Sequence, residues 1–117
     1  MRNYMNLNAF KLLDDLVLEV YSITKFFPKE EQYGLSLQLR RALISATSNI
    51  VEGSYRDSQK EYYRFLEIAF SSFKEAQYQL LLAERLGYLK TSQLTSCKAN
   101  FVIKEKVFAG LLRSMKS

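Results

Sequence analysis

Hydrophobic side chains between residues 58 and 86 recur in alternating steps of four and three residues. This heptad spacing is typical of a helix that packs at a shallow angle in a bundle, and its alanines let a neighbouring helix approach closely. The seven positions are Tyr62, Leu66, Ala69, Phe73, Ala76, Leu80 and Ala83. Ser58 and Glu61 form a capping box that predicts the start of this helix, and Gly87 is the expected stop.

Apolar residues with helical spacing also mark three other segments, at about residues 8–26, 30–52 and 92–115. The second of these has two flanking apolar stripes, so more than one neighbour should bury it. The first stripe consists of Leu35, Leu39, Leu43 (or Ala42), Ala46 and Ile50, and the second of Ile44, Thr47 and Val51. Gly34 lies inside this pattern and weakens it by about 1 kcal/mol relative to Ala. Gly53 is predicted to end this helix in the left-handed conformation that is common after the last helical residue.

The connections between the four predicted helices are only a few residues long. Connections of this length join antiparallel neighbours, so the sequence predicts an all-α fold, an antiparallel up-down-up-down four-helix bundle. One proline and four glycines give too few turn signals for a multi-stranded sheet. A length of 117 residues fits a single domain, residues 1–117, that can bury a core of its own.

Histidine is absent from the sequence, and Cys97 is the one cysteine. Histidine-based acid–base and triad catalysis are therefore excluded, and a zinc or haem site is not expected. No phosphate loop, nucleophile elbow or Glu-x-x-His pair occurs in the sequence either. We expect a protein that is not an enzyme and that uses no cofactor, metal or small-molecule substrate. Cys97 is expected to be a small apolar residue on a helix.

The N-terminal sequence does not resemble a signal peptide, because it has no uninterrupted apolar stretch and soon reaches Asp14 and Asp15. No run approaches the roughly 18 apolar residues that a membrane span needs. We therefore expect a cytoplasmic protein with no membrane partner.

The positive charge of the chain is concentrated in its last quarter. The whole sequence carries a net charge of +5, and residues 89–117 account for all of it. The charged residues there are Lys90, Lys98, Lys104, Lys106, Arg113 and Lys116 against Glu105 alone. Such a helix is either a phosphate-facing surface or a solvated face that happens to be rich in lysine.

Lysines without interleaved arginines or exposed aromatic side chains favour contact with the nucleic-acid backbone rather than with the bases. Binding of this kind is sensitive to salt and only weakly specific for sequence. The candidate contacts are Lys98, Lys104, Lys106, Arg113, Arg40 and Arg56.

Arg40 and Arg41 are adjacent on one predicted helix, where neighbouring side chains point about 100° apart and cannot share one task. Arg41 lies near Ile44 within the apolar arc, so it should either pair with a carboxylate or contact phosphate. The candidate carboxylates are those of Glu52, Glu67 and Glu75.

A second polar cluster stands at the corner between the second and third helices. Its residues are Asn49, Glu52, Arg56 and Arg64, and it is either a lock for this corner or one lip of an anion site. The structural polar network predicted from both clusters comprises Arg41, Asn49, Glu52, Arg64 and Glu75.

A family resemblance runs from residue 27 to residue 89. Its motifs are Phe27-Pro28, Glu30 or Glu31, Tyr33-Gly34-Leu35, Gln38, Arg40-Arg41-Ala42, Ser45, Asn49-Ile50, Glu52-Gly53, Arg56, Arg64-Phe65-Leu66, Ala69, Ser72, Glu75 and Leu86-Gly87-Tyr88-Leu89. This pattern resembles the four-helix-bundle family associated with intervening sequences in bacterial large-subunit ribosomal RNA genes. Ser71 stands where that family usually has glycine, which argues against a very tight helix–helix approach, and Tyr55 replaces a small residue in the loop.

The resemblance implies a four-helix protomer in a ring-like homopentamer, with basic surface around the ring axis. The family is similar to accessory proteins of diversity-generating retroelements, which act with a reverse transcriptase and nucleic acid. A reverse transcriptase and RNA or DNA are thus the implied partners. Two hypotheses remain open: an oligomeric accessory protein that binds nucleic-acid backbone or a ribonucleoprotein, and a scaffold bundle that docks an acidic protein.

Overall fold

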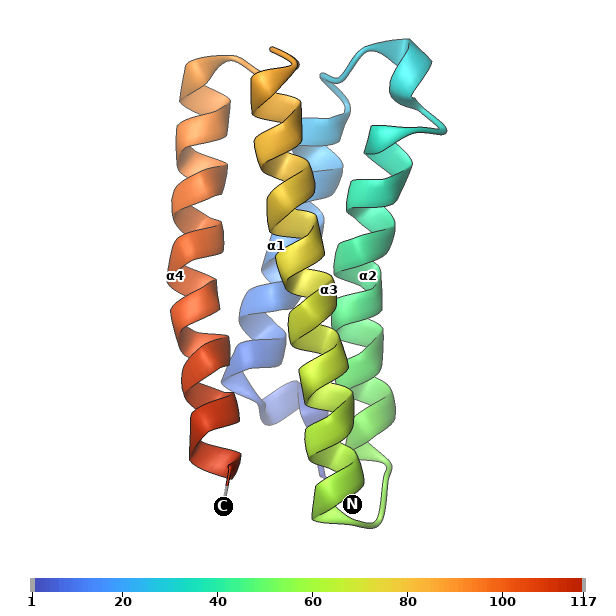
Figure 1. Ribbon diagram of the computed structural model, residues 1–117, viewed down its shortest axis with the longest axis vertical. Helices are drawn as coiled ribbons and strands as arrows, with labels where there is room; N and C mark the ends of the chain where they lie inside the picture. The colour runs from blue at the N-terminus through green and yellow to red at the C-terminus, as the bar shows by residue number, and fades with distance from the viewer. Residues whose placement is uncertain (1, 117) are drawn as a thin grey trace.

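Four long helices run alternately in opposite directions along the molecule (Figure 1). The computed structural model describes residues 2–116, and within this range there is no β-strand. The long helices are α1 (Asn8–Thr24), α2 (Leu35–Ser54), α3 (Gln59–Arg85) and α4 (Thr91–Met115), and the short 3-10 helices η1 (Tyr4–Asn6) and η2 (Lys29–Glu31) precede α1 and α2. The predicted all-α fold with four helices is confirmed.

The two ends of the bundle carry different parts of the chain. Figure 1 shows both chain termini and the α2–α3 connection at one end, which we call the terminal end. The α1–α2 and α3–α4 connections lie at the other end, which we call the distal end. The molecule measures 43 Å along its longest axis.

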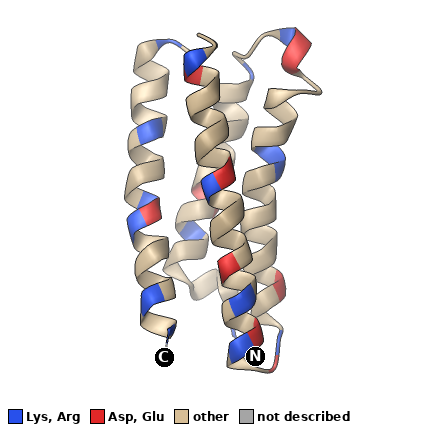
Figure 2. Cartoon of the chain, viewed as in Figure 1, with Lys and Arg blue, Asp and Glu red and all other residues tan. Residues whose placement is uncertain are grey.

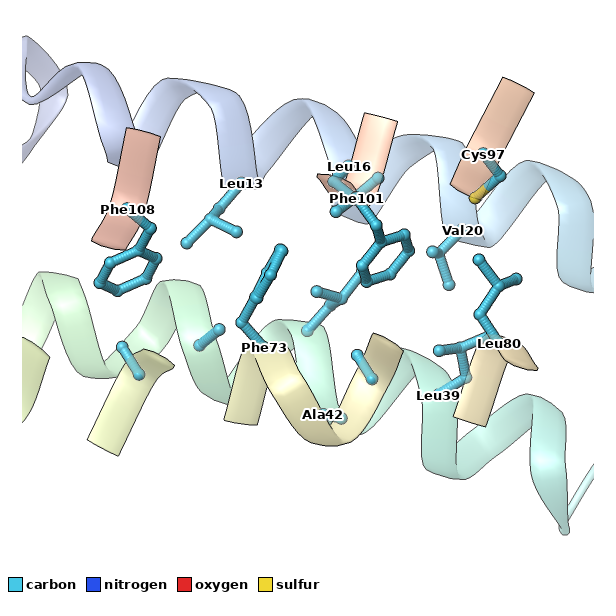
Figure 3. Close-up of a cluster of buried hydrophobic side chains, with 14 of the residues drawn as sticks. Leu13, Leu16, Val20, Leu39, Ala42, Phe73, Leu80, Cys97, Phe101 and Phe108 are labelled. Atoms are coloured by element: carbon cyan, nitrogen blue, oxygen red, sulfur yellow. The ribbon is translucent and has the colours of Figure 1, made fainter. Parts of the chain in front are cut away.

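The hydrophobic core lies between all four helices (Figure 3). Each helix packs against the next one in sequence and α4 packs back against α1, while the α2–α3 contact is by far the most extensive. All seven heptad positions of α3 are buried, as predicted. The largest fully buried side chains include Leu13, Leu16, Leu39, Leu43, Phe73, Phe101 and Phe108.

The start of the second helix differs from the prediction. The sequence pattern predicts one helix over residues 30–52, but the structure divides this segment into η2 and α2. At the break, Gly34 has φ −109° and ψ −115°, outside the helical region. Glu31 then caps α2, because its Oε1 atom accepts a hydrogen bond from the backbone N–H of Leu35 at 2.9 Å. A Cβ atom on residue 34 would collide with this carboxylate, so glycine fits here.

The Glu31 carboxylate also ties the start of α2 to the α3–α4 connection. The Tyr88 hydroxyl donates a hydrogen bond to Glu31 Oε2 at 2.6 Å. The Leu35 N–H, and after it the Tyr88 hydroxyl, lower the pKa of Glu31 below its ordinary value of 4.5. The same bond raises the pKa of Tyr88 above its ordinary value of 10.0. Both shifts favour an ionised Glu31 and a protonated Tyr88 at pH values between 4.5 and 10.0. The hydrogen bond between them therefore stabilises the folded state at neutral pH.

Replacing Tyr88 by Phe should lower the free energy of unfolding at pH 7 and lower it less at pH 3. Because the pKa of Glu31 is lowered in the folded state, its contribution to the free energy of unfolding is present above pH 4.5. This contribution is lost as the pH falls through the pKa of Glu31 in the folded protein. Urea unfolding at both pH values measures the difference between wild type and variant. Tyr33→Phe is the matched control, since Tyr33 is 81% exposed. An equal gap at both pH values would contradict the role of the Glu31 carboxylate.

Gly53 does not form the predicted left-handed end of the second helix. α2 continues to Ser54, and Gly87 is the one glycine with a positive φ, 74°. A Cβ atom on Gly53 would lie 2.6 Å from the Cβ atom of Phe65 on α3. Glycine at position 53 therefore serves the close approach of α2 and α3, while Gly87 ends α3 as predicted.

The contact between α2 and α3 is tight although Ser71 replaces the glycine that is usual in the family. Ser71 is exposed, so it does not lie between the two helices. The next residue, Ser72, faces α2, and its hydroxyl oxygen lies 3.0 Å from that of Ser45. The expectation of a looser approach at position 71 is wrong for this reason.

Candidate nucleic-acid interface

Lys98 is held in an ion pair between α4 and α3. Its Nζ atom lies 3.0 Å from Glu84 Oε1. About two turns further along α4, the Glu105 carboxylate pairs with Lys74 of α3 at 2.9 Å and accepts a hydrogen bond from Gln77 at 3.1 Å. Lys74 contributes most to lowering the pKa of Glu105. One of these ion pairs neutralises Lys98, a predicted nucleic-acid contact, and the other neutralises Glu105, the one acidic residue of α4.

The other three predicted contacts on α4 do not share one face. Lys104 and Lys106 are two residues apart, which places them about 200° apart around the helix. Lys106 and Arg113 are seven residues apart and therefore lie on the same side, where both are exposed. Neither pairs with a carboxylate of residues 2–116. Figure 2 shows basic positions along the whole length of α4.

Arg56 lies at the terminal end and is already paired. Its Nη2 atom lies 2.7 Å from Glu52 Oε1, and its guanidinium stacks over the ring of Phe65 at 4.8 Å. Arg2 reaches the same corner, because its Nη1 atom donates to the Arg56 carbonyl oxygen at 2.7 Å. Sequence reasoning missed Arg2, which no motif marks. Arginine contacts thus tie this corner, but of the four residues predicted to cluster there only Glu52 and Arg56 contact each other.

Arg40 lies near the distal end, far along α2 from Arg56. Its guanidinium stacks over the Tyr21 ring, 4.4 Å from the ring centroid. Its Nε atom donates a hydrogen bond to Thr24 Oγ1 at 2.8 Å. The six predicted contacts are therefore distributed over both ends and several sides of the bundle, and they do not form one patch.

The predicted polar network does not assemble as a unit. Arg41 is exposed and forms no ion pair with the part of the chain that the structure describes, so the predicted pair within the protomer is wrong. Its neighbour Ile44 is itself 39% exposed, which shows that the buried arc of α2 is narrower than the sequence suggests. The remaining members are dispersed: Asn49 donates to the Ser45 carbonyl, Glu75 accepts from Gln79, Arg64 is exposed, and Glu52 pairs with Arg56.

Cys97 is fully buried against the core, as predicted. Burial raises the pKa of its thiol to about 12, and the nearby Glu19 carboxylate acts in the same direction. A thiol held protonated in this way is a poor nucleophile.

Residues 2–116 contain no group of His, Cys, Asp and Glu side chains arranged to hold a metal ion. Among the helices described, none has the length and apolar character needed to cross a membrane.

These features define a basic, all-α protein built as an antiparallel four-helix bundle. A family model described as 23S rRNA-intervening sequence protein matches residues 5–108, and the chain belongs to this family. The resemblance carried by the motifs is therefore confirmed.

The fold is similar to the crystal structure of a protein with unknown function from the S23 ribosomal protein family of Bacteroides thetaiotaomicron. The TM-score is 0.79, and the match covers 89% of this chain and 97% of that chain at 21% sequence identity. At this identity the likeness shows the shared fold alone. No curated protein matches the sequence.

Proposed function

We propose that the protein is a non-enzymatic, homo-oligomeric accessory protein that binds the backbone of nucleic acid through its basic surface. The observation that supports this most directly is the lack of charge compensation on the outward side of α4. Three ion pairs occur within residues 2–116, and Lys106 and Arg113 take part in none of them. The family description, which refers to an intervening sequence of 23S rRNA, is consistent with an RNA or ribonucleoprotein ligand. A reverse transcriptase is proposed as a partner on the resemblance alone.

Uncompensated surface cations favour phosphate because binding releases counterions from the nucleic acid. Each phosphate contact makes affinity fall by about 3.5-fold between 50 and 200 mM salt, from a slope of about 0.9 per contact. Lys106 and Arg113 are exposed and stand on a rigid helix, so they can reach phosphates without rearrangement of the fold. Base-specific recognition is not expected from such contacts.

The double change Lys106→Glu/Arg113→Glu should weaken binding to RNA or DNA by about tenfold or more and reduce the salt slope by about 2. Electrophoretic mobility shifts at 50 and 200 mM salt measure both quantities. Lys11→Glu/Arg85→Glu is the matched control, because it makes the same change in net charge at exposed positions of α1 and α3. Equal losses in the two double variants would attribute binding to net charge alone. No binding by the wild type at 50 mM salt would contradict the proposal.

Self-association is the second part of the proposal, and the groove between α3 and α4 is its candidate surface. The groove has a volume of about 190 Å³ and is lined by Gln77, Leu80, Leu81, Lys98, Phe101 and Val102. Leu81 is 40% exposed and Val102 is 48% exposed. The neighbouring Lys98–Glu84 and Lys74–Glu105 pairs are neutral, so a second copy meets little like-charge repulsion here.

Light scattering of the wild type should give a mass several times the protomer mass of 13.7 kDa, and five times that mass for the ring implied by the resemblance. Leu81→Asp/Val102→Asp should return the protein to a monomer, because two carboxylates would have to be buried in the contact. Leu18→Asp, at a 68% exposed position of α1, is the control. A wild-type monomer would contradict assembly, and an oligomeric double variant would exclude this groove as the interface.

An acidic protein is the alternative partner for the same side of α4. Ile103 is 56% exposed and Val102 lies beside it, so this side presents apolar side chains next to the Lys106 ammonium group. Such a mixture also fits an amphipathic segment with acidic flanks. Binding of nucleic acid in the mobility-shift experiment separates the two functions, since a protein-only scaffold has no such affinity to lose.

A further inference from the structure

A cavity of about 270 Å³ lies at the distal end, between the end of α1 and the start of α2. Its lining includes the cationic side chains of Lys25, Lys29 and Arg40, and no carboxylate belongs to the described residues around it. The rest of the lining comprises Thr24, Phe27, Pro28, Gln32 and Ser36. Three cations around a small hollow without a counter-charge create a positive potential that attracts an anion.

The Arg40 guanidinium is held in place by uncharged neighbours. It stacks over the Tyr21 ring at 4.4 Å, Nε donates to Thr24 Oγ1 at 2.8 Å, and Nη2 donates to the Tyr21 carbonyl at 3.4 Å. Thr24 is in turn fixed by donating its own hydroxyl to the Val20 carbonyl at 2.7 Å. No hydrogen bond from Nη1 to any residue in the range 2–116 is present. The arginine is therefore pre-positioned, and its outer N–H groups remain available to a ligand.

The two acidic residues nearest to the cavity in sequence, Glu30 and Glu31, are not among the residues that line it. The Glu31 carboxylate is occupied by the Leu35 N–H and the Tyr88 hydroxyl. Because Glu31 already compensates the first N–H of α2, the end of this helix does not itself supply the site. The three cationic side chains supply it.

We propose that this cavity binds a phosphate group. Arg40 offers two N–H groups side by side, which match two phosphate oxygens, and Lys25 and Lys29 add charge from the rim. Ser36, on the first turn of α2, lines the same hollow, and its hydroxyl group can supply a further donor. A volume of about 270 Å³ suits a small ligand of this kind rather than a large one.

Two exposed aromatic residues follow lining residues in the sequence and favour a phosphate that belongs to a nucleotide. Phe26 is 63% exposed and follows Lys25, and Tyr33 is 81% exposed and follows Gln32. Rings of this kind stack with unpaired bases in proteins that bind single strands. That the phosphate comes from a nucleic-acid strand rests on the function proposed above, whereas recognition of the phosphate group itself does not.

The test uses the full chain with three ligands: inorganic phosphate, adenosine monophosphate and a short single-stranded oligonucleotide. Backbone amide shifts of the ¹⁵N-labelled protein are followed during titration at constant ionic strength, and affinities are taken from the same curves. Arg40→Gln and Lys25→Gln/Lys29→Gln are the variants, and the second keeps the test valid if the first perturbs folding. Lys11→Gln/Lys60→Gln, at the terminal end, is the control with the same loss of charge as the lysine variant.

Phosphate should shift the amides of residues 24–40, and each cavity variant should weaken its binding by about tenfold to a hundredfold while the control does not. Shifts spread evenly over the surface lysines, or affinities unchanged in both cavity variants, would overturn the site. If the oligonucleotide loses affinity in parallel, the phosphate belongs to a strand; if only inorganic phosphate and the mononucleotide do, the ligand is a free phosphate compound. Lys106→Glu/Arg113→Glu should leave phosphate binding intact, so failure of the α4 surface and failure of the cavity are distinguishable.

Discussion

Phe73→Ala is expected to lower the free energy of unfolding by about 3–5 kcal/mol, the usual loss when a buried phenylalanine is truncated. Phe73 is completely buried on α3. Its ring centroid lies 5.4 Å from that of Phe101 and 6.4 Å from that of Phe108, both on α4 (Figure 3). It also stacks with Phe70 at 6.2 Å. Truncation removes three aromatic contacts at once, and neighbouring large rings on a rigid helix collapse poorly into the space.

Urea unfolding at a fixed protomer concentration measures this loss, because self-association would otherwise change the apparent stability. Domains of this size have about 5–15 kcal/mol of stability in total, so the variant retains a small margin or none. Phe26→Ala is the matched control: its side chain is 63% exposed, and its removal should change stability by less than about 0.5 kcal/mol. A loss below about 1 kcal/mol for Phe73→Ala would show that the α3–α4 contact does not depend on this ring.

The course of α3 could be predicted from the sequence because its signals are local and agree with one another. Ser58 accepts a hydrogen bond from the Glu61 N–H at 3.0 Å, which is one of the two bonds of the predicted capping box; the reciprocal bond to the Glu61 carboxylate is absent from the described residues. Gly87 adopts the positive φ that ends the helix. Between these points the heptad spacing fixes which side faces the core. Where propensity, capping and periodicity coincide, tertiary packing has nothing to override.

The two errors in α2 arise from contacts with distant residues. The predicted helix breaks at Gly34, where the neighbouring Glu31 carboxylate is bonded to Tyr88, a residue 57 positions away in sequence. Gly53 looks like a helix end by its type, but its lack of a Cβ atom serves a contact with Phe65. A glycine in the sequence does not reveal whether it permits a backbone conformation or a close approach.

The candidate site was less predictable than the fold, since charge counts ignore cross-helix register. Lys98 looks like a free cation in the sequence, but it is paired with Glu84 on the neighbouring helix. Arg40 is predicted only as a nucleic-acid contact, and the sequence does not reveal that its neighbours are Tyr21 and Thr24 of α1. Lys25 and Lys29 do not stand out in the sequence, and only the α1–α2 connection in the structure brings them to the same cavity as Arg40.

Gly53→Ala is expected to destabilise the protein, although glycine to alanine within a helix normally stabilises it. The gain in helix propensity is about 1 kcal/mol. Against it, the new Cβ atom would lie 2.6 Å from Phe65 Cβ, an atom next to the backbone that cannot swing away. Forcing extra atoms into a packed interface costs about 1–3 kcal/mol, so the net change should be a loss of up to about 2 kcal/mol. Gly53→Leu should reach the upper part of the packing range, near 3 kcal/mol.

Gly110 is the matched control, because it lies within α4 and a Cβ atom there would meet only Arg113 Nη2, at 3.7 Å. Gly110→Ala should therefore raise the free energy of unfolding by about 0.5–1 kcal/mol, measured by the same urea titration. Opposite signs at the two positions would establish that close approach of α2 and α3, rather than backbone freedom, selects glycine at position 53. If Gly53→Ala stabilised the protein as Gly110→Ala does, Phe65 and α3 would have to be able to move, and the tight α2–α3 contact would not be a requirement of the fold.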